Sequence, residues 1–140
     1  MDIYEATQSL LAGLAEGANV TYIQLTYDEK TDTFNIPDYP AVTWLYSNLV
    51  PIVSHDGGSG LYKVLLDVEI WGGLDDVVRY EKLITRGLNA KRAAVGGTEF
   101  TVILKDSRDI VDLGLDCKHR FMRFAGVVEV NEEEDEDMEG

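Results

Sequence analysis

Cysteine is almost absent from this chain of 140 residues, where Cys117 is the single example. One thiol cannot form an internal disulfide, and zinc sites built on paired cysteines are excluded as well. No apolar run approaches the roughly 20 residues that a membrane-spanning helix needs. The first 16 residues carry Asp2 and Glu5 where a signal peptide has basic residues. We therefore expect a chain suited to a reducing cytosol, without export or membrane insertion.

Basic residues are also few, because 12 Lys and Arg stand against 26 Asp and Glu and give a formal net charge of -14. The charge is unevenly distributed: residues 1–78 carry a net -10, residues 79–131 a net +3, and residues 132–139 a net -7. Nucleic-acid affinity comes largely from Lys and Arg that displace counterions. Direct sequence-specific binding of nucleic acid is therefore not expected.

The length fits one domain, since a chain of this size buries about two thirds of its unfolded surface. We assign a single α+β domain to residues 1–131 and a disordered acidic tail to residues 132–140. Seven of the eight positions from Glu132 to Glu139 are acidic, and their mutual repulsion keeps such a segment unfolded. Two interpretations of the tail stay open, a solubility device and an arm that masks a basic patch until assembly.

What the chain does contain is clearest between Leu61 and Asn89, where a strand, a glycine break and a helix follow one another. Successive side chains of a strand point to opposite sides. The predicted apolar face holds Tyr62, Val64, Leu66, Val68 and Ile70, and the mixed face holds Leu61, Lys63, Leu65, Asp67, Glu69 and Trp71. After Gly72 and Gly73 the period becomes helical, with an apolar stripe of Leu74, Val77, Tyr80, Ile84 and Leu88. Asp75 and Asp76 in the first turn complement the helix dipole.

The first 40 residues predict a helix, an edge-like strand and a long loop. The helix runs from Asp2 to Glu16, and Gly17 is placed to cap its end. The strand covers Val20–Tyr27, which is rich in β-branched and aromatic residues. The loop covers Asp28–Pro40, and loops of that length usually bind something or become ordered in an assembly. The apolar residues expected to dock locally within it are Phe34 and Ile36.

The remaining predicted elements are a strand at 41–46, a turn at 54–60, a strand at 98–105, a polar turn at 106–116 and a strand at 117–130. Lys91 and Arg92 lie where they complement the second helix dipole, and Gly126 marks a bulge or a close approach. The order of elements is α, β, β, β, α, β, β. It predicts an α+β fold in which a mainly antiparallel β-sheet is packed by two α-helices.

Reactive groups are sparse, and we assign no catalytic, cofactor-binding or metal-binding residue. His55 and Asp56 lie in the glycine-rich turn, but adjacent residues rarely face each other and no nucleophile precedes them at a fixed spacing. Asp67 and Glu69 share a strand face with Lys63, as in a metal nuclease, although a solvated sheet face explains them more simply. A small metal-dependent hydrolase that uses Asp67, Glu69 and His55 remains an alternative.

A short basic stretch stands out in the last predicted strand, where Lys118, His119, Arg120 and Arg123 fall close together. One interpretation is a solvated strand face, because antiparallel sheets commonly leave one side in water. The other is a docking surface for an acidic partner, including the acidic half of an identical subunit.

The order of these pieces resembles that of the tail terminator proteins of long-tailed bacteriophages, also called tail completion or minor tail proteins. The resemblance spans about residues 2–130 and rests on the segments DYPAV (38–42), TWLY (43–46), YKVLLDVEIW (62–71), LDDVVRYEKLITRGL (74–88) and FMRFAGVVEV (121–130). It implies an α+β fold and a hexameric ring that caps the tail tube, stops its polymerisation and faces the head connector. The implied location is the head-proximal end of the virion tail, reached from the host cytoplasm during assembly. The acidic extension after Val130 departs from the pattern, and the resemblance brings no active-site residue or cofactor.

A cyclic ring uses heterologous contacts, in which one face of a subunit meets a different face of the next. A chain with separate acidic and basic blocks is suited to such contacts. The residues predicted to contribute most to assembly are Arg79, Lys82, Arg86, Lys118, Arg120 and Arg123. Expected partners are further copies of the chain, the tail tube protein and a connector or neck protein.

Two interpretations besides the hydrolase compete with this one. The first is a head-closure or neck protein of the virion, which shares small α+β folds and ring symmetry. The second is an acidic regulator whose tail imitates nucleic acid and occupies a basic partner.

Overall fold

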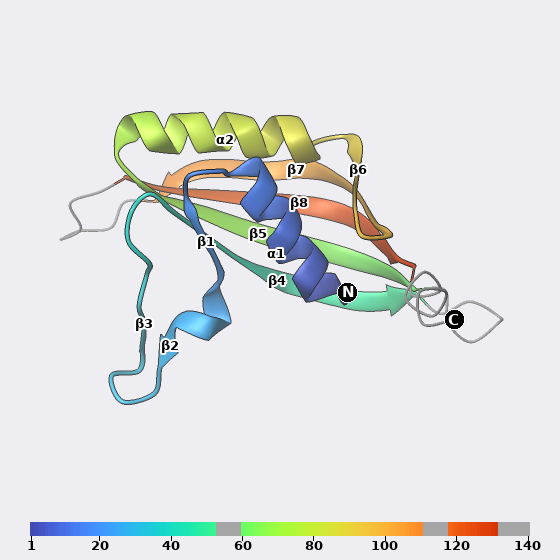
Figure 1. Cartoon of the computed structure of the whole chain (residues 1–140), viewed down its shortest axis with the longest axis horizontal. Helices are drawn as coiled ribbons and strands as arrows, with labels where there is room; N and C mark the ends of the chain where they lie inside the picture. Colours follow the sequence, from blue (N-terminus) through green and yellow to red (C-terminus); the bar gives the residue numbers. More distant parts are fainter. Residues whose placement is uncertain (53–59, 111–117, 132–140) are drawn as a thin grey trace.

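The chain folds as an α+β structure with one large, mainly antiparallel sheet and two helices on the same face of it (Figure 1). The computed structural model describes residues 1–52, 60–110 and 118–131, apart from the side chain of Leu25. The sheet has the strand order β1-β4-β5-β8-β7-β6. The predicted fold class is thereby confirmed. Most of the predicted turn at 54–60, including His55 and Asp56, lies outside the described residues, as do Cys117 and the acidic tail.

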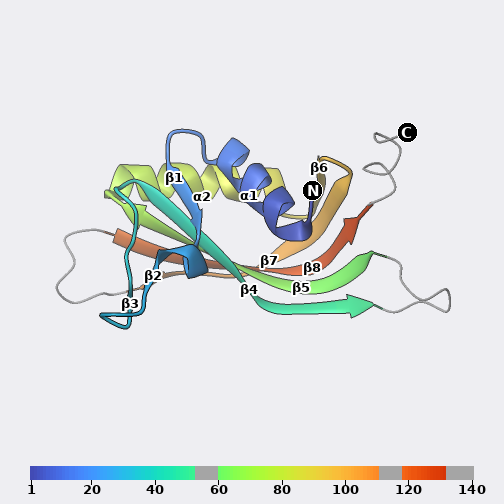
Figure 2. The same ribbon diagram turned by 60° about the horizontal axis from the view of Figure 1, so that its bottom comes forward.

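The central strand is β5 (Leu61–Gly72), and it pairs antiparallel with β4 (Ala41–Ile52) and β8 (Lys118–Val130). Its predicted apolar face is buried, since Val64, Leu66, Val68 and Ile70 are at most 1% exposed. The same face of the sheet continues through Trp44, Phe124 and Phe100. Figure 2 shows both α-helices lying over this face, so the core forms between the α-helices and the sheet. No α-helix of the described residues covers the opposite face.

Both edges of the sheet are made by short strands. β1 (Asn19–Tyr22) pairs parallel with the first four residues of β4, and it is the one parallel strand pair in the described part of the sheet. At the other edge, β6 (Lys91–Val95) pairs with β7 (Thr98–Ile110). The edge position predicted for the first strand is confirmed, but that strand ends at Tyr22. The 3-10 helix η1 (Ile23–Thr26) follows it.

Helix α1 (Ile3–Leu14) begins at a side-chain cap, because the side chain of Asp2 accepts a hydrogen bond from the backbone N–H of Glu5 at 2.8 Å. Its C-cap is Ala15, so the prediction that Gly17 caps the helix is wrong. Gly17 lies in the following turn with φ +97°, a conformation that glycine adopts without strain.

Helix α2 (Leu74–Leu88) has the predicted bounds and buries Val77, Tyr80, Ile84 and Leu88. The fifth residue of the predicted stripe, Leu74, is 60% exposed. At about 100° per residue it lies at the margin of the stripe, in the first turn of the helix.

Several strand predictions need correction. Lys91 and Arg92 belong to β6 and not to the end of α2, because the chain turns back within two residues to form a strand. β4 continues to Ile52 and β7 to Ile110, each past a β-bulge that shifts the register of the ladder by one residue. Gly126 is a point of close approach to β7 without a bulge of its own.

The predicted loop at 28–40 contains a small hairpin. β2 (Tyr27–Asp28) pairs with β3 (Thr33–Phe34) in a separate two-stranded sheet. The hairpin projects away from the helices and the large sheet, and Figures 1 and 2 both show this. We call residues 27–34 the arm.

Candidate interaction surfaces

Three of the six predicted contact residues form a cationic row on α2. Arg79, Lys82 and Arg86 are exposed and, at about 100° per residue, fall on the side of the helix opposite its buried stripe. Within the described residues none of the three has an ion pair, and the guanidinium of Arg79 lies 5.3 Å from the ring centre of Tyr80. We call these three cations the basic ridge. They are available for contact with another molecule.

Arg120 and Arg123 of β8 are engaged inside the subunit. Arg120 forms ion pairs with Glu81 of α2 at 2.8 Å and with Asp109 of β7 at 3.0 Å. Arg123 binds Asp67 with two hydrogen bonds of 2.7 and 3.0 Å, and these bonds and the charge of Asp67 raise the pKa of the guanidinium. Lys118 is exposed. The basic stretch of β8 is therefore neutralised in large part by the subunit itself, and the basic ridge is the less compensated surface.

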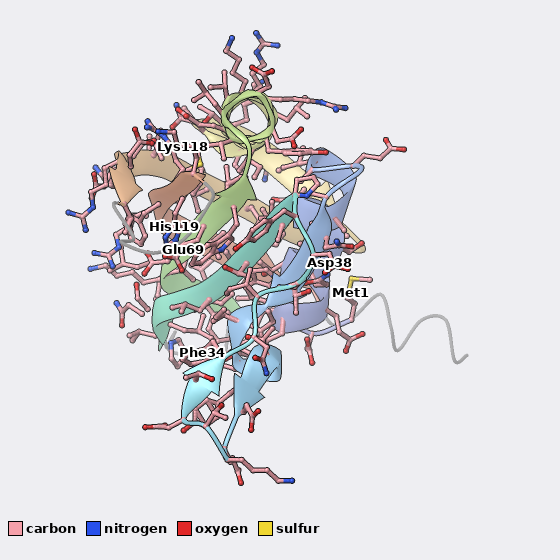
Figure 3. All side chains as sticks on the ribbon, turned by 90° about the vertical axis from the view of Figure 1, so that its left-hand side faces the viewer. Met1, Phe34, Asp38, Glu69, Lys118 and His119 are labelled. Atoms are coloured by element: carbon pink, nitrogen blue, oxygen red, sulfur yellow. The ribbon has the colours of Figure 1, made fainter. Side chains whose placement is uncertain are left out.

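The sheet face opposite the helices carries a polar network. On it, His119 Nε2 lies 2.9 Å from Glu69 Oε1, and the imidazole stacks on the Trp71 ring with 3.5 Å between centres. Figure 3 shows Glu69 and His119 next to each other. With Asp67 held by Arg123, both carboxylates of the hydrolase alternative already have cationic or imidazole partners. No group of three His, Cys, Asp or Glu residues suited to a metal occurs among the residues that the structure describes.

An apolar cleft of about 500 Å³ lies between α1, β1 and β4. Aromatic rings dominate it, since the Tyr22 and Trp44 rings are 4.7 Å apart and that of Tyr4 lies 5.6 Å from Tyr22. Gln8 satisfies two polar groups of the cleft: its amide donates to the carbonyl of Val20 at 2.8 Å, and its Oε1 accepts from Trp44 Nε1 at 2.7 Å. The lining of the cleft is therefore mainly aromatic, and the hydrogen bonds of Gln8 connect α1 to the edge strand β1 and to β4.

The Tyr46 ring packs against those of Tyr4 and Trp44. We expect its buried phenol to cause a loss of stability at high pH. Burial raises the pKa of its phenol well above the ordinary value, outweighing the 2.5 Å hydrogen bond with Thr7. Above about pH 10 the unfolded chain loses this proton while the folded chain keeps it. The free energy of unfolding should therefore fall as the pH rises further, by up to about 1.4 kcal/mol per pH unit for one proton. In urea titrations between about pH 9 and 12, Tyr46→Phe should show a shallower fall than the parent, and equal slopes would contradict the assignment.

The arm combines acidic charge with exposed aromatic rings. Tyr27 and Phe34 are 40% and 46% exposed, and their rings lie 5.2 Å apart. The arm contains three acids and one base, namely Asp28, Glu29, Asp32 and Lys30, for a net charge of -2. Phe34 was expected to dock locally, and it does contact Tyr27, but nearly half of its surface stays exposed.

Local hydrogen bonds hold the arm in one shape. The Tyr27 hydroxyl bonds the Asp32 carboxylate, and the Asp28 carboxylate accepts from the backbone N–H of Lys30 at 2.9 Å. At the base, the N–H of Asn35 donates to the Thr26 carbonyl at 2.9 Å. Because an isolated two-stranded hairpin is marginally stable, these bonds account for an ordered arm that buries little surface.

Comparison with known proteins gave no match to a protein-family model and no match to a curated protein. No helix among the described residues is long and apolar enough to cross a membrane. The sequence named the three residues of the basic ridge only as part of a larger set of six cations. It did not reveal the arm as a structured element, because the many turn residues there indicated an irregular loop. The one available signal was that two aromatic residues, Tyr27 and Phe34, flank a polar stretch that begins Asp-Glu-Lys.

Proposed function

We propose that this protein is a structural tail terminator of a long-tailed bacteriophage. In this role it forms a ring of about six copies that caps the tail tube, ends tube polymerisation and offers the surface for head joining. The sequence resemblance over residues 2–130 suggests the role. One structural observation supports it most: an acidic chain keeps three cations of α2 exposed and without ion-pair partners among the described residues. Such a surface suits contact with an acidic partner, and the acidic half of a further copy is one that every subunit supplies.

The sheet edges add to this support. In the described part of the chain, β1 and β6 form the two opposite edges of the large sheet. Unpaired edges readily accept strands or loops of neighbouring chains. Contacts between unlike surfaces of identical chains close into rings when the rotation between subunits allows it.

The first test is to measure the molar mass of the protein in solution. Light scattering of the purified chain should give about 94 kDa, six times the subunit mass of 15.6 kDa, and negative-stain images should show an annulus. Added to polymerising tube protein, the chain should bind one end of each tube and fix tube length. A chain that stays monomeric alone and with tube protein would contradict the proposal. A ring that binds heads but leaves tube length uncontrolled would favour the head-closure role.

A further inference from the structure

We propose that the arm of one copy docks on the basic ridge of the next copy in the ring. This inference rests on the proposed ring assembly and names the two surfaces that build it. The arm consists of residues 27–34, and the ridge of Arg79, Lys82 and Arg86. Each copy would contribute its arm to one neighbour and its ridge to the other.

The chemistry of the two surfaces is complementary. A guanidinium can bind two kinds of partner at once, because its edge donates hydrogen bonds to carboxylates and its face stacks on aromatic rings. The arm offers both, with Asp28 and Glu29 beside the Tyr27 and Phe34 rings. Partial burial under these rings would strengthen ion pairs that are weak in open water. An acidic hairpin with exposed aromatic rings is thus a better partner for arginines than an acidic surface alone.

The placement of the two surfaces fits a head-to-tail contact. Figures 1 and 3 show α2 at one end of the molecule and the arm at the opposite end. In Figure 3 many side chains around α2 end in nitrogen, whereas those of the arm mostly end in oxygen, and the labelled Phe34 belongs to the arm. The arm of a subunit therefore lies away from its own ridge and is free to reach that of a neighbour. A contact between unlike surfaces is what ring closure requires.

The order of the arm is a further argument for docking. Hydrogen bonds of Tyr27, Asp28 and Asn35 fix its shape before any partner arrives. Ordering a loop on binding costs free energy, and a loop that is already ordered avoids this cost. An exposed hairpin that buries little surface of its own is explained if its exposed side is a contact surface.

A charge-swap experiment tests the inference. The arm variant Asp28→Asn/Glu29→Arg changes the net charge of the arm from -2 to +1, and the amide oxygen introduced at position 28 can still accept the bond from the N–H of Lys30. The ridge variant Arg79→Glu/Arg86→Glu changes the ridge from +3 to -1. Each variant alone should weaken assembly roughly tenfold or more at low salt, because like charges then face each other. A chain carrying all four substitutions should assemble within about threefold of the parent.

The matched control is Lys63→Glu/Lys105→Glu, which changes the same amount of charge as the ridge variant at exposed cations away from the ridge. It should assemble like the parent, and circular dichroism should show native structure for every variant. A parent that forms rings while the arm and ridge variants assemble normally would overturn the docking inference but leave the ring proposal standing. A parent that forms no oligomer alone or on tubes would instead contradict the ring proposal.

A second measurement needs no substitution. A zero-length carbodiimide joins carboxylates to amines that are in contact, so it should link Asp28 or Glu29 to Lys82 in the assembled protein. Mixing normal and ¹⁵N-labelled copies before assembly shows by mass spectrometry whether the linked peptides come from different subunits. Mixed-isotope arm-to-ridge peptides support the inference. Their absence, in a sample where other links between subunits are found, overturns it.

Discussion

Replacing Gly126 with alanine should destabilise the fold by roughly 2–3 kcal/mol, the upper part of the range for overpacked interiors. An added Cβ would lie 2.1 Å from the carbonyl oxygen of Thr101 and 2.8 Å from the Cα of Val102. Both are backbone atoms of β7, so no side-chain rotation can relieve the clash, and β7 must move away from β8. The two strands carry Phe100 and Phe124 of the core, so their separation would also loosen the packing under α2.

The control for Gly126→Ala is Gly13→Ala. Gly13 lies in α1, and no described atom outside the helix backbone comes within 4 Å of an added Cβ. Alanine there should stabilise the protein by about 0.5–1 kcal/mol, because glycine is the poorer helix former. Urea unfolding followed by tryptophan fluorescence separates the two outcomes by sign. If Gly126→Ala had the midpoint of the parent, the close approach of β7 and β8 would be wrong.

Trp44→Ala should be still more damaging, with a loss of about 3–5 kcal/mol as for other buried aromatic residues. Trp44 is 2% exposed and stands opposite Tyr22 of β1 and Val68 of β5. Its indole N–H also supplies the hydrogen bond to Gln8 of α1. Truncation would leave a cavity in the place where the first helix, the edge strand and the central sheet meet. Since domains are stable by only about 5–15 kcal/mol, the loss threatens folding altogether.

Two comparisons separate packing from hydrogen bonding at this site. Trp44→Phe keeps most of the ring but leaves the Gln8 oxygen without its donor, so a smaller loss of about 1–3 kcal/mol is expected. Val50→Ala, on the same strand but 46% exposed, should change stability by no more than about 0.5 kcal/mol. Chemical unfolding of the three variants should give this ranking. Equal losses for Trp44→Ala and Val50→Ala would show that Trp44 is not part of the core.

Prediction from the sequence succeeded where a short run of consecutive residues contains the complete hydrophobic pattern of an element. The alternation over 61–71 and the change of period after Gly73 define β5 and α2, because strand and helix periods are properties of neighbouring residues. The same reasoning located α1. It failed for β6, whose five residues KRAAV have little β propensity and form a strand only by pairing with β7.

The sequence alone also located the candidate contact residues without ranking them. Six cations were expected to act together, yet only their surroundings distinguish them. Arg123 is held by Asp67, 56 residues away, and Arg120 by Glu81, 39 residues away. Ion pairs over such separations depend on strand register, which no local pattern specifies.

The sequence by itself determined the α+β class, the buried face of β5 and the helices α1 and α2, because hydrophobic periodicity is written in consecutive residues. Tertiary structure decided the parallel pairing of β1 with β4, the projection of the arm and the neutralisation of Arg120 and Arg123. These features arise from contacts between distant segments, whose free energies depend on which surfaces the fold brings together. For that reason the basic ridge on α2 becomes distinct from the other cations only in the folded chain.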